Sequence, residues 1–164
     1  MKVLPSNAQV ANELDNVADE TEGSARKEKL LQMRREALEI MKALKNFHPK
    51  LIGSVWRGTT RRDSDIDIAA FTSDPTTVLV QLQHKNFKVA NTEWRSAPKL
   101  SRREKAFHIY LLLSSGNQAE VVVRSLERLS EKEKCEIYGD IVTGLSCRQL
   151  EKVLVDDPFR KLVP

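Results

Sequence analysis

Residues 65–71 read Asp-Ile-Asp-Ile-Ala-Ala-Phe, and this stretch constrains the fold more than any other part of the chain. Acidic and apolar residues alternate at its start, and the residues that follow are all apolar. Side chains two positions apart on a strand leave it on the same face. Asp65 and Asp67 would therefore share one face, while the isoleucines between and after them enter the core. The pattern predicts a strand whose first end opens onto a site.

Two carboxylates held side by side repel one another unless a cation lies between them. Oxygen ligands at this spacing suit Mg²⁺ or Mn²⁺, with phosphate oxygens completing the coordination. The alternative is a strand end whose acids pair with arginines of the preceding segment, namely Arg57, Arg61 or Arg62. Taken alone, the Asp-Ile-Asp segment leaves both interpretations open.

Upstream of these acids stands Gly53-Ser54, at the expected end of a short strand and start of a helix. Free backbone N–H groups and a serine hydroxyl at such a junction can hold a phosphate. Positions 55–64 then separate Ser54 from Asp65. A Gly-Ser pair is a common turn by itself, but its place just before the paired acids indicates a phosphate-binding site.

The remaining periodicity predicts an α/β fold of the α+β kind, with a small mixed, mostly antiparallel sheet and helices packed on one face. An amphipathic helix is expected over 26–47, and its basic face is either solvated or a nucleic-acid surface. The other expected elements are strands over 50–53, 65–71, 87–95, 107–113 and 120–124, and helices over 54–58, 75–85, 130–138 and 146–155.

The length of 164 residues suits one folded domain. Residues 1–25 are polar and acidic and are expected to form a flexible or loosely packed N-terminal arm. Residues 26–164 are expected to be a single domain, with its core over 48–125 and a helical tail over 126–164.

The composition bears on where the protein is found in the cell. Hydrophobic residues make up 40% of the chain and charged residues 30%, and no apolar run approaches the roughly 20 residues that a membrane helix needs. We therefore expect a cytoplasmic protein with no membrane partner. The net charge of +4 makes a partner that carries phosphates plausible.

Three segments carry a resemblance to a known family: Gly53-Ser54, the spacer with Arg57-Gly58, and Ser64-Asp65-Ile66-Asp67-Ile68. Together they resemble the signature of the DNA polymerase β type nucleotidyltransferase superfamily, in which a Gly-Gly/Ser pair precedes an Asp-hydrophobic-Asp/Glu segment. The form is similar to the minimal nucleotidyltransferases of prokaryotes, some of which are antitoxins. The resemblance covers residues 50–71 by motif and 76–125 by the order of elements.

Family members carry a third carboxylate on a later strand, beside the first two. Glu120 in the segment Ala119-Glu-Val-Val-Val-Arg124 is the matching position, although many relatives have Asp there. Glu93 is the fallback for this role.

The resemblance implies an enzyme that moves a nucleoside monophosphate from an NTP, expected to be ATP, to an acceptor hydroxyl with release of pyrophosphate. Its implied catalytic residues are Asp65, Asp67 and Glu120, which would also hold two Mg²⁺ ions, with Mn²⁺ as the other candidate. Its implied nucleotide-binding residues are Gly53, Ser54, Arg57 and Ser64.

The acceptor stays open among protein, RNA and small molecule. RNA is suggested by the basic helix at 26–45 and a basic loop at 95–105. Few residues follow Arg124 to bind an acceptor, so a homodimer or a partner protein is expected to complete the cleft. The alternative is an antitoxin-like or regulatory nucleotide-binding module that acts through a protein partner.

Overall fold

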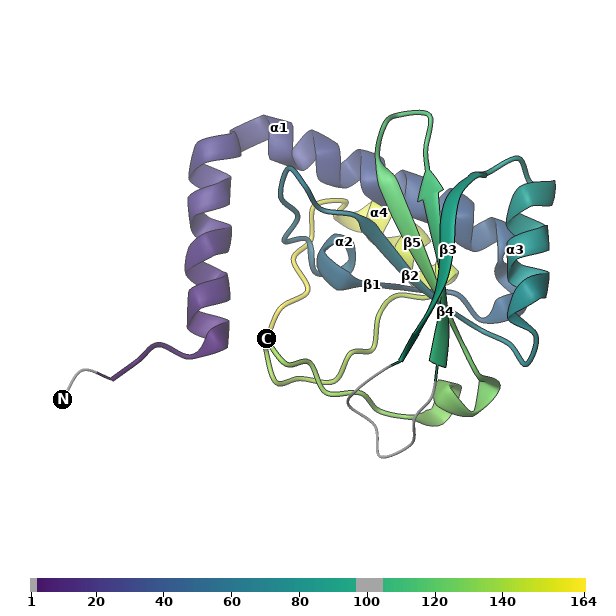
Figure 1. Ribbon diagram of the computed structural model, residues 1–164. Helices are drawn as coiled ribbons and strands as arrows, with labels where there is room; N and C mark the ends of the chain where they lie inside the picture. The colour runs from purple at the N-terminus through teal and green to yellow at the C-terminus, as the bar shows by residue number, and fades with distance from the viewer. Residues whose placement is uncertain (1–2, 97–104) are drawn as a thin grey trace.

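The computed structural model describes residues 3–96 and 105–164. Its helices are α1 (Asn7–Ala43), α2 (Gly53–Arg57), α3 (Pro75–His84) and α4 (Cys147–Asp156), with 3-10 turns η1 (Lys45–Phe47) and η2 (Leu126–Ser130). Its strands are β1 (Lys50–Ile52), β2 (Ile66–Phe71), β3 (Lys88–Ser96), β4 (Lys105–Leu112) and β5 (Gln118–Arg124) (Figure 1).

The strands form one sheet in the order β1-β2-β5-β4-β3. The central pair β2 and β5 is parallel, and the other neighbouring pairs are antiparallel. The expected mixed, mostly antiparallel sheet is therefore confirmed. The parallel pair matters for function because it sets the first acidic strand and the strand of Glu120 side by side.

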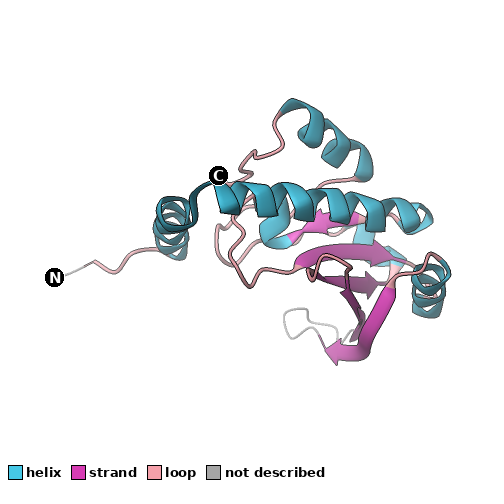
Figure 2. Cartoon of the chain, turned by 90° about the horizontal axis from the view of Figure 1, so that it is seen from above, coloured by secondary structure: helices cyan, strands magenta, loops and turns pink. Residues whose placement is uncertain are grey.

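Helices α1 and α3 pack on one face of this sheet, and α4 packs on α1 (Figure 2). Alternate strand residues point into the space between the layers, where they are shielded from water. The fully buried side chains of this core include Met33, Ile40, Met41, Ile66, Ile68, Val78, Ile109 and Val121. The helices thus cover one face and leave carboxylates on the other.

Helix α1 begins at Asn7 and is interrupted at Gly23, so the part after the interruption matches the helix expected from Arg26, and a further helical part precedes it. Ser6 and Gln9 form a capping box that starts the helix, and the chain bends at Gly23, whose φ of 56° is non-helical. Arg26 donates hydrogen bonds to Asp15 and Asp19 across this bend. These polar contacts, rather than an apolar stripe, hold the first part of the helix, which is why periodicity missed it. The division of the chain at residue 25 stays a prediction.

The helix expected over 130–138 is wrong. The amide of Cys135 donates to the carbonyl of Asp140, and the amide of Val142 donates to the carbonyl of Glu133, so the chain reverses instead of coiling. Gly139, with φ of 76°, sits in this reversal. The Glu133 carboxylate accepts from Arg124 rather than completing a helix cap. Ser130 and Glu133 have the spacing of a capping box, which favours a helix start, but no helix begins here.

The helices expected over 75–85 and 146–155 are confirmed as α3 and α4. Asp74 caps α3 and Pro75 opens it, while Ser146 and Gln149 form a capping box at the start of α4. The hairpin between β4 and β5 turns at Gly116, with φ of 90°. No helix within the described residues is long and apolar enough to cross a membrane. The basic loop at 95–105 falls mostly outside the described residues.

Candidate active site

The sheet register brings the three predicted acids to one place. Asp67 is paired with Glu120 across the parallel strands β2 and β5, so the two side chains leave the same face. Asp65 stands two positions before Asp67, immediately ahead of the start of β2. The charge of Glu120 raises the pKa of both aspartates, and the charge of Asp65 also raises that of Asp67. The structure thus assembles a carboxylate cluster of Asp65, Asp67 and Glu120 on the sheet face away from α1 and α3.

Burial and mutual repulsion make this cluster a poor place for three negative charges. Burial, followed by the charges of Glu120 and Asp65, raises the pKa of Asp67 to about 7. Burial and the charges of Glu120 and Asp63 also raise the pKa of Asp65, which Lys29 partly offsets. The described neighbours of Asp67 supply no positive charge that lowers its pKa. The cluster therefore favours the binding of protons or of cations.

Gly53 lies directly against this cluster. Its φ of 72° is in the left-handed region, and a Cβ at this position would lie 3.1 Å from both Cβ and Cγ of Asp67 and would overlap its carboxylate. Residue Ile52, just before it, pairs with Asp67 in the sheet. The backbone at the start of α2 is consequently packed onto the Asp67 side chain, with Ser54 next along the chain.

Arg57 is placed differently from the other predicted nucleotide-binding residues. Arg57 as a whole is 5% exposed, and its guanidinium donates to both carboxylate oxygens of Asp140, at 2.8 and 2.7 Å, and to the carbonyl of Leu162. It also stacks between the rings of Trp56 and Tyr138. These contacts fasten the C-terminal segment to α2 and leave Arg57 no part in the cluster.

The arginines before β2 do not neutralise the acids either. Arg57 pairs with Asp140, and Arg62 pairs with Glu22 of α1 at 3.7 Å. Ser64 closes the intervening loop, because its Oγ accepts the Arg61 amide at 2.8 Å and its own amide donates to the Arg61 carbonyl. Ser64 thereby sets the position of the chain just before Asp65.

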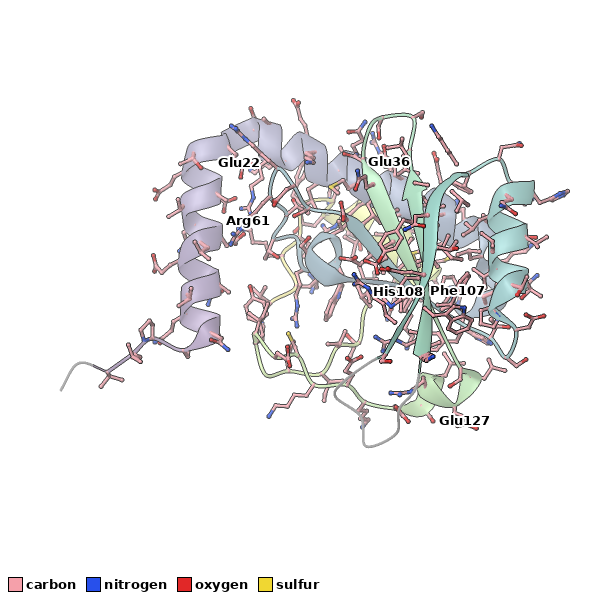
Figure 3. All side chains as sticks on the ribbon, in the orientation of Figure 1. Glu22, Glu36, Arg61, Phe107, His108 and Glu127 are labelled. Atoms are coloured by element: carbon pink, nitrogen blue, oxygen red, sulfur yellow. The ribbon has the colours of Figure 1, made fainter. Side chains whose placement is uncertain are left out.

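The structure adds one residue to the site that the sequence did not point out. His108 of β4, labelled in Figure 3, is hydrogen-bonded through Nδ1 to Oε1 of Glu120. The signal was strand alternation: Phe107 and Ile109 are buried, which puts His108 on the same face as Glu120. Next to it, Tyr110 donates to Glu93 at 2.5 Å, and Arg95 pairs with Glu93 at 2.7 Å.

A hollow of about 430 Å³ opens beside the cluster, on the side away from Gly53. Asp65 lines one end, and the rest of its polar wall comes from β3, β4 and β5, namely Asn91, Glu93, Arg95, Tyr110 and Gln118. The volume falls within the range of small-molecule sites. The cluster therefore lies between the Gly53-Ser54 backbone and an open space.

The donor set of the cluster fits a hard divalent cation, because it consists of carboxylate oxygens from three acids held close together. In the present side-chain conformation, the His, Cys, Asp and Glu residues of the described ranges form no closed group of three that could hold a metal. One oxygen of Glu120 is engaged by His108, and a carboxylate retains a second oxygen.

The mixed sheet and the Gly-Ser turn packed on paired acids match the arrangement that the resemblance to nucleotidyltransferases implies. The family model described as "Nucleotidyltransferase domain" matches residues 34–142, well over half of the chain, and the protein belongs to this family. The match includes Gly53, the three acids and His108. A search of curated protein sequences found no match.

Solved structures with a similar fold are larger proteins. A cytoplasmic RNA terminal U-transferase is 17% identical, with 76% of this chain and 36% of that chain covered and a TM-score of 0.40. The Cid1 poly(U) polymerase is 17% identical, with coverage of 73% and 38% and a TM-score of 0.43. A chain of the GLD-2/RNP-8 complex is 13% identical, with 76% of this chain and 44% of that chain covered and a TM-score of 0.41. This chain spans less than half the length of each.

Proposed function

We propose that the protein transfers a nucleoside monophosphate from an NTP, with ATP as the first candidate, to an acceptor hydroxyl in a Mg²⁺-dependent reaction. The observation that supports this most strongly is the register of Asp67 opposite Glu120, with Asp65 beside them and the Gly53 backbone packed on Asp67. Membership of the nucleotidyltransferase family supports the same class of reaction.

Each element has a separate task in this proposal. Gly53 and Ser54 hold the triphosphate, because only a residue without a side chain lets the backbone approach Asp67 and a bound phosphate. Ser64 fixes the loop that carries Asp65. Arg57 takes no part, since its guanidinium is already bound to Asp140 and Leu162.

Asp65, Asp67 and Glu120 would hold the divalent cations, which neutralise negative charge on the transferred phosphoryl group when bound. Glu120, which stands between Asp67 of β2 and His108 of β4, orients the acceptor hydroxyl. The hydroxyl oxygen forms a bond to the α-phosphorus, the bond to the β-phosphate oxygen breaks, and pyrophosphate leaves. The hydroxyl proton passes to a carboxylate or to water.

The acceptor is the part of the proposal with least support from this chain. Arg26 and Arg34 of the basic helix are buried, and Lys27 lies over the ring of Phe159. That face of α1 is thus partly used within the protein, which weakens the case for RNA at this helix. The hollow beside Asp65 gives a small molecule, a protein side chain or a nucleotide end room to approach.

Thermal stabilisation by each of the four NTPs, with and without Mg²⁺, tests the nucleotide site. We expect stabilisation of the wild type that requires Mg²⁺ and is lost in the Asp65→Asn/Asp67→Asn double variant. Release of pyrophosphate from a labelled NTP, with candidate acceptors added in turn, then tests transfer. Stabilisation without turnover would favour a nucleotide-binding module, and no stabilisation by any NTP would refute the proposal.

A further inference from the structure

His108 and Glu120 meet on the sheet face that carries the acids. Nδ1 of His108 is hydrogen-bonded to Oε1 of Glu120, and both side chains are largely shielded, at 13% and 20% exposure. A carboxylate oxygen can only accept, so the Nδ1 hydrogen is donated to it. The bond joins neighbouring strands, β4 and β5, whose backbones are fixed by the sheet ladder.

A ring contact with Tyr110 adds to this bond. The His108 ring stacks on the Tyr110 ring, with centroids 6.4 Å apart and planes at 22°. Tyr110 is held in turn because its hydroxyl donates a hydrogen bond to Glu93, which also forms an ion pair with Arg95. A row of polar side chains therefore runs from β3 to Glu120 and ends at the carboxylate cluster.

We propose that His108 is a positioning residue for Glu120, an inference that rests on the proposed function. A glutamate side chain has several rotatable bonds, and fixing it costs conformational entropy each time it binds a cation. The His108 bond fixes Oε1 beforehand and leaves the second oxygen of Glu120 to face Asp67 and a cation. Partners of this kind typically strengthen metal binding 10–100-fold when they orient a ligand.

The test compares two substitutions at one position. His108→Leu removes the donor and keeps much of the volume, whereas His108→Asn keeps an N–H close to the place of Nδ1. The matched control is His84→Leu, at an exposed histidine near the end of α3. Binding of Mn²⁺ in the presence of a non-transferable NTP analogue is measured by electron paramagnetic resonance, and each variant's fold is checked by circular dichroism.

We expect His108→Leu to weaken Mn²⁺ binding about tenfold, and His108→Asn to stay within about threefold of the wild type because its hydrogen bond is kept. His84→Leu should bind like the wild type. In a Glu120→Gln background, the further effect of His108→Leu should largely disappear, because the histidine acts through that carboxylate.

The outcomes separate this inference from the proposed function. Failure of the wild-type protein to bind Mn²⁺ with the nucleotide analogue would refute both the inference and the proposed function. Normal wild-type binding with an unchanged His108→Leu variant would overturn the inference alone. An equal loss from His108→Leu with and without Glu120→Gln would also overturn it, because the histidine would then act by another route.

Discussion

Gly53 and Asp67 share a space that admits only one side chain. The two residues come from α2 and β2, and a Cβ added at Gly53 would overlap the Asp67 carboxylate. The positive φ of 72° at Gly53 also disfavours any residue with a side chain. The approach of the α2 backbone to the acids therefore depends on glycine at this position.

Gly53→Ala should abolish Mg²⁺-dependent stabilisation by NTPs, because the new methyl group must displace Asp67. Gly116→Ala is the matched control, since Gly116 also has a positive φ but open space around it. Gly116→Ala should lose about 1 kcal/mol of stability from the backbone conformation, measured by urea denaturation, and Gly53→Ala should lose more because of the added overlap with Asp67. Nucleotide binding by Gly53→Ala that equals that of Gly116→Ala would contradict the proposed role.

Asp67→Asn should stabilise the metal-free protein above neutral pH. The pKa of Asp67 is raised from 3.8 to about 7 by burial, Glu120 and Asp65, so the folded state binds the proton more tightly than the unfolded state. Asp67 therefore has no destabilising effect below the unfolded pKa, lowers stability as pH rises through this window, and is fully unfavourable above it.

We expect the two proteins to be equally stable at about pH 4 and the variant to gain about 2 kcal/mol at about pH 8, in buffer with a chelator. Denaturation by urea across this pH range measures the difference. Asp156→Asn, at an exposed acid of α4, is the control. A gap between wild type and Asp67→Asn that does not widen with pH would argue against the buried carboxylate.

Glu120→Gln should lower the rate of nucleotide transfer by at least about 100-fold. Glu93, the other candidate for the third acid, lies on β3 and does not stand opposite Asp67. Glu93 instead accepts from Tyr110 and Arg95 at the far side of the hollow. Glu93→Gln should therefore keep substantially more activity than Glu120→Gln in the same assay. The reverse order would move the third acid from β5 to β3.

Arg34 should be among the most sensitive positions for stability. Its side chain is fully buried and donates to the carbonyls of Val55, Trp56, Pro158 and Arg160, and burial lowers its pKa to about 10. Arg34→Met leaves these carbonyls without donors and should cost about 3 kcal/mol.

Arg35→Met, one residue along on the exposed side of α1, is the control and should change stability by less than about 0.5 kcal/mol. Urea denaturation of both variants gives the comparison. Equal stabilities would mean that the C-terminal segment and α2 do not depend on this arginine.

The sequence by itself determined the local parts of the site. Strand alternation placed Asp65 and Asp67 on one face, and the Gly53-Ser54 turn before them indicated a phosphate site, because both depend on neighbours along the chain. The starts of α3 and α4 could also be predicted, and the structure shows that Asp74 and Ser146 cap these helices within one turn. The family resemblance then supplied Glu120.

The tertiary structure decided everything that depends on contacts between distant segments. Arg57 follows the Gly53-Ser54 motif closely in sequence, yet its guanidinium is hydrogen-bonded to Asp140 and to the carbonyl of Leu162. Glu133 has the sequence position of a capping residue for Ser130, yet its carboxylate accepts a hydrogen bond from Arg124 instead. His108 joins Glu120 only because β4 and β5 are neighbours in the sheet. Periodicity carries no information on which charged group a long side chain will reach, because that depends on how strands and loops far apart in the chain are packed.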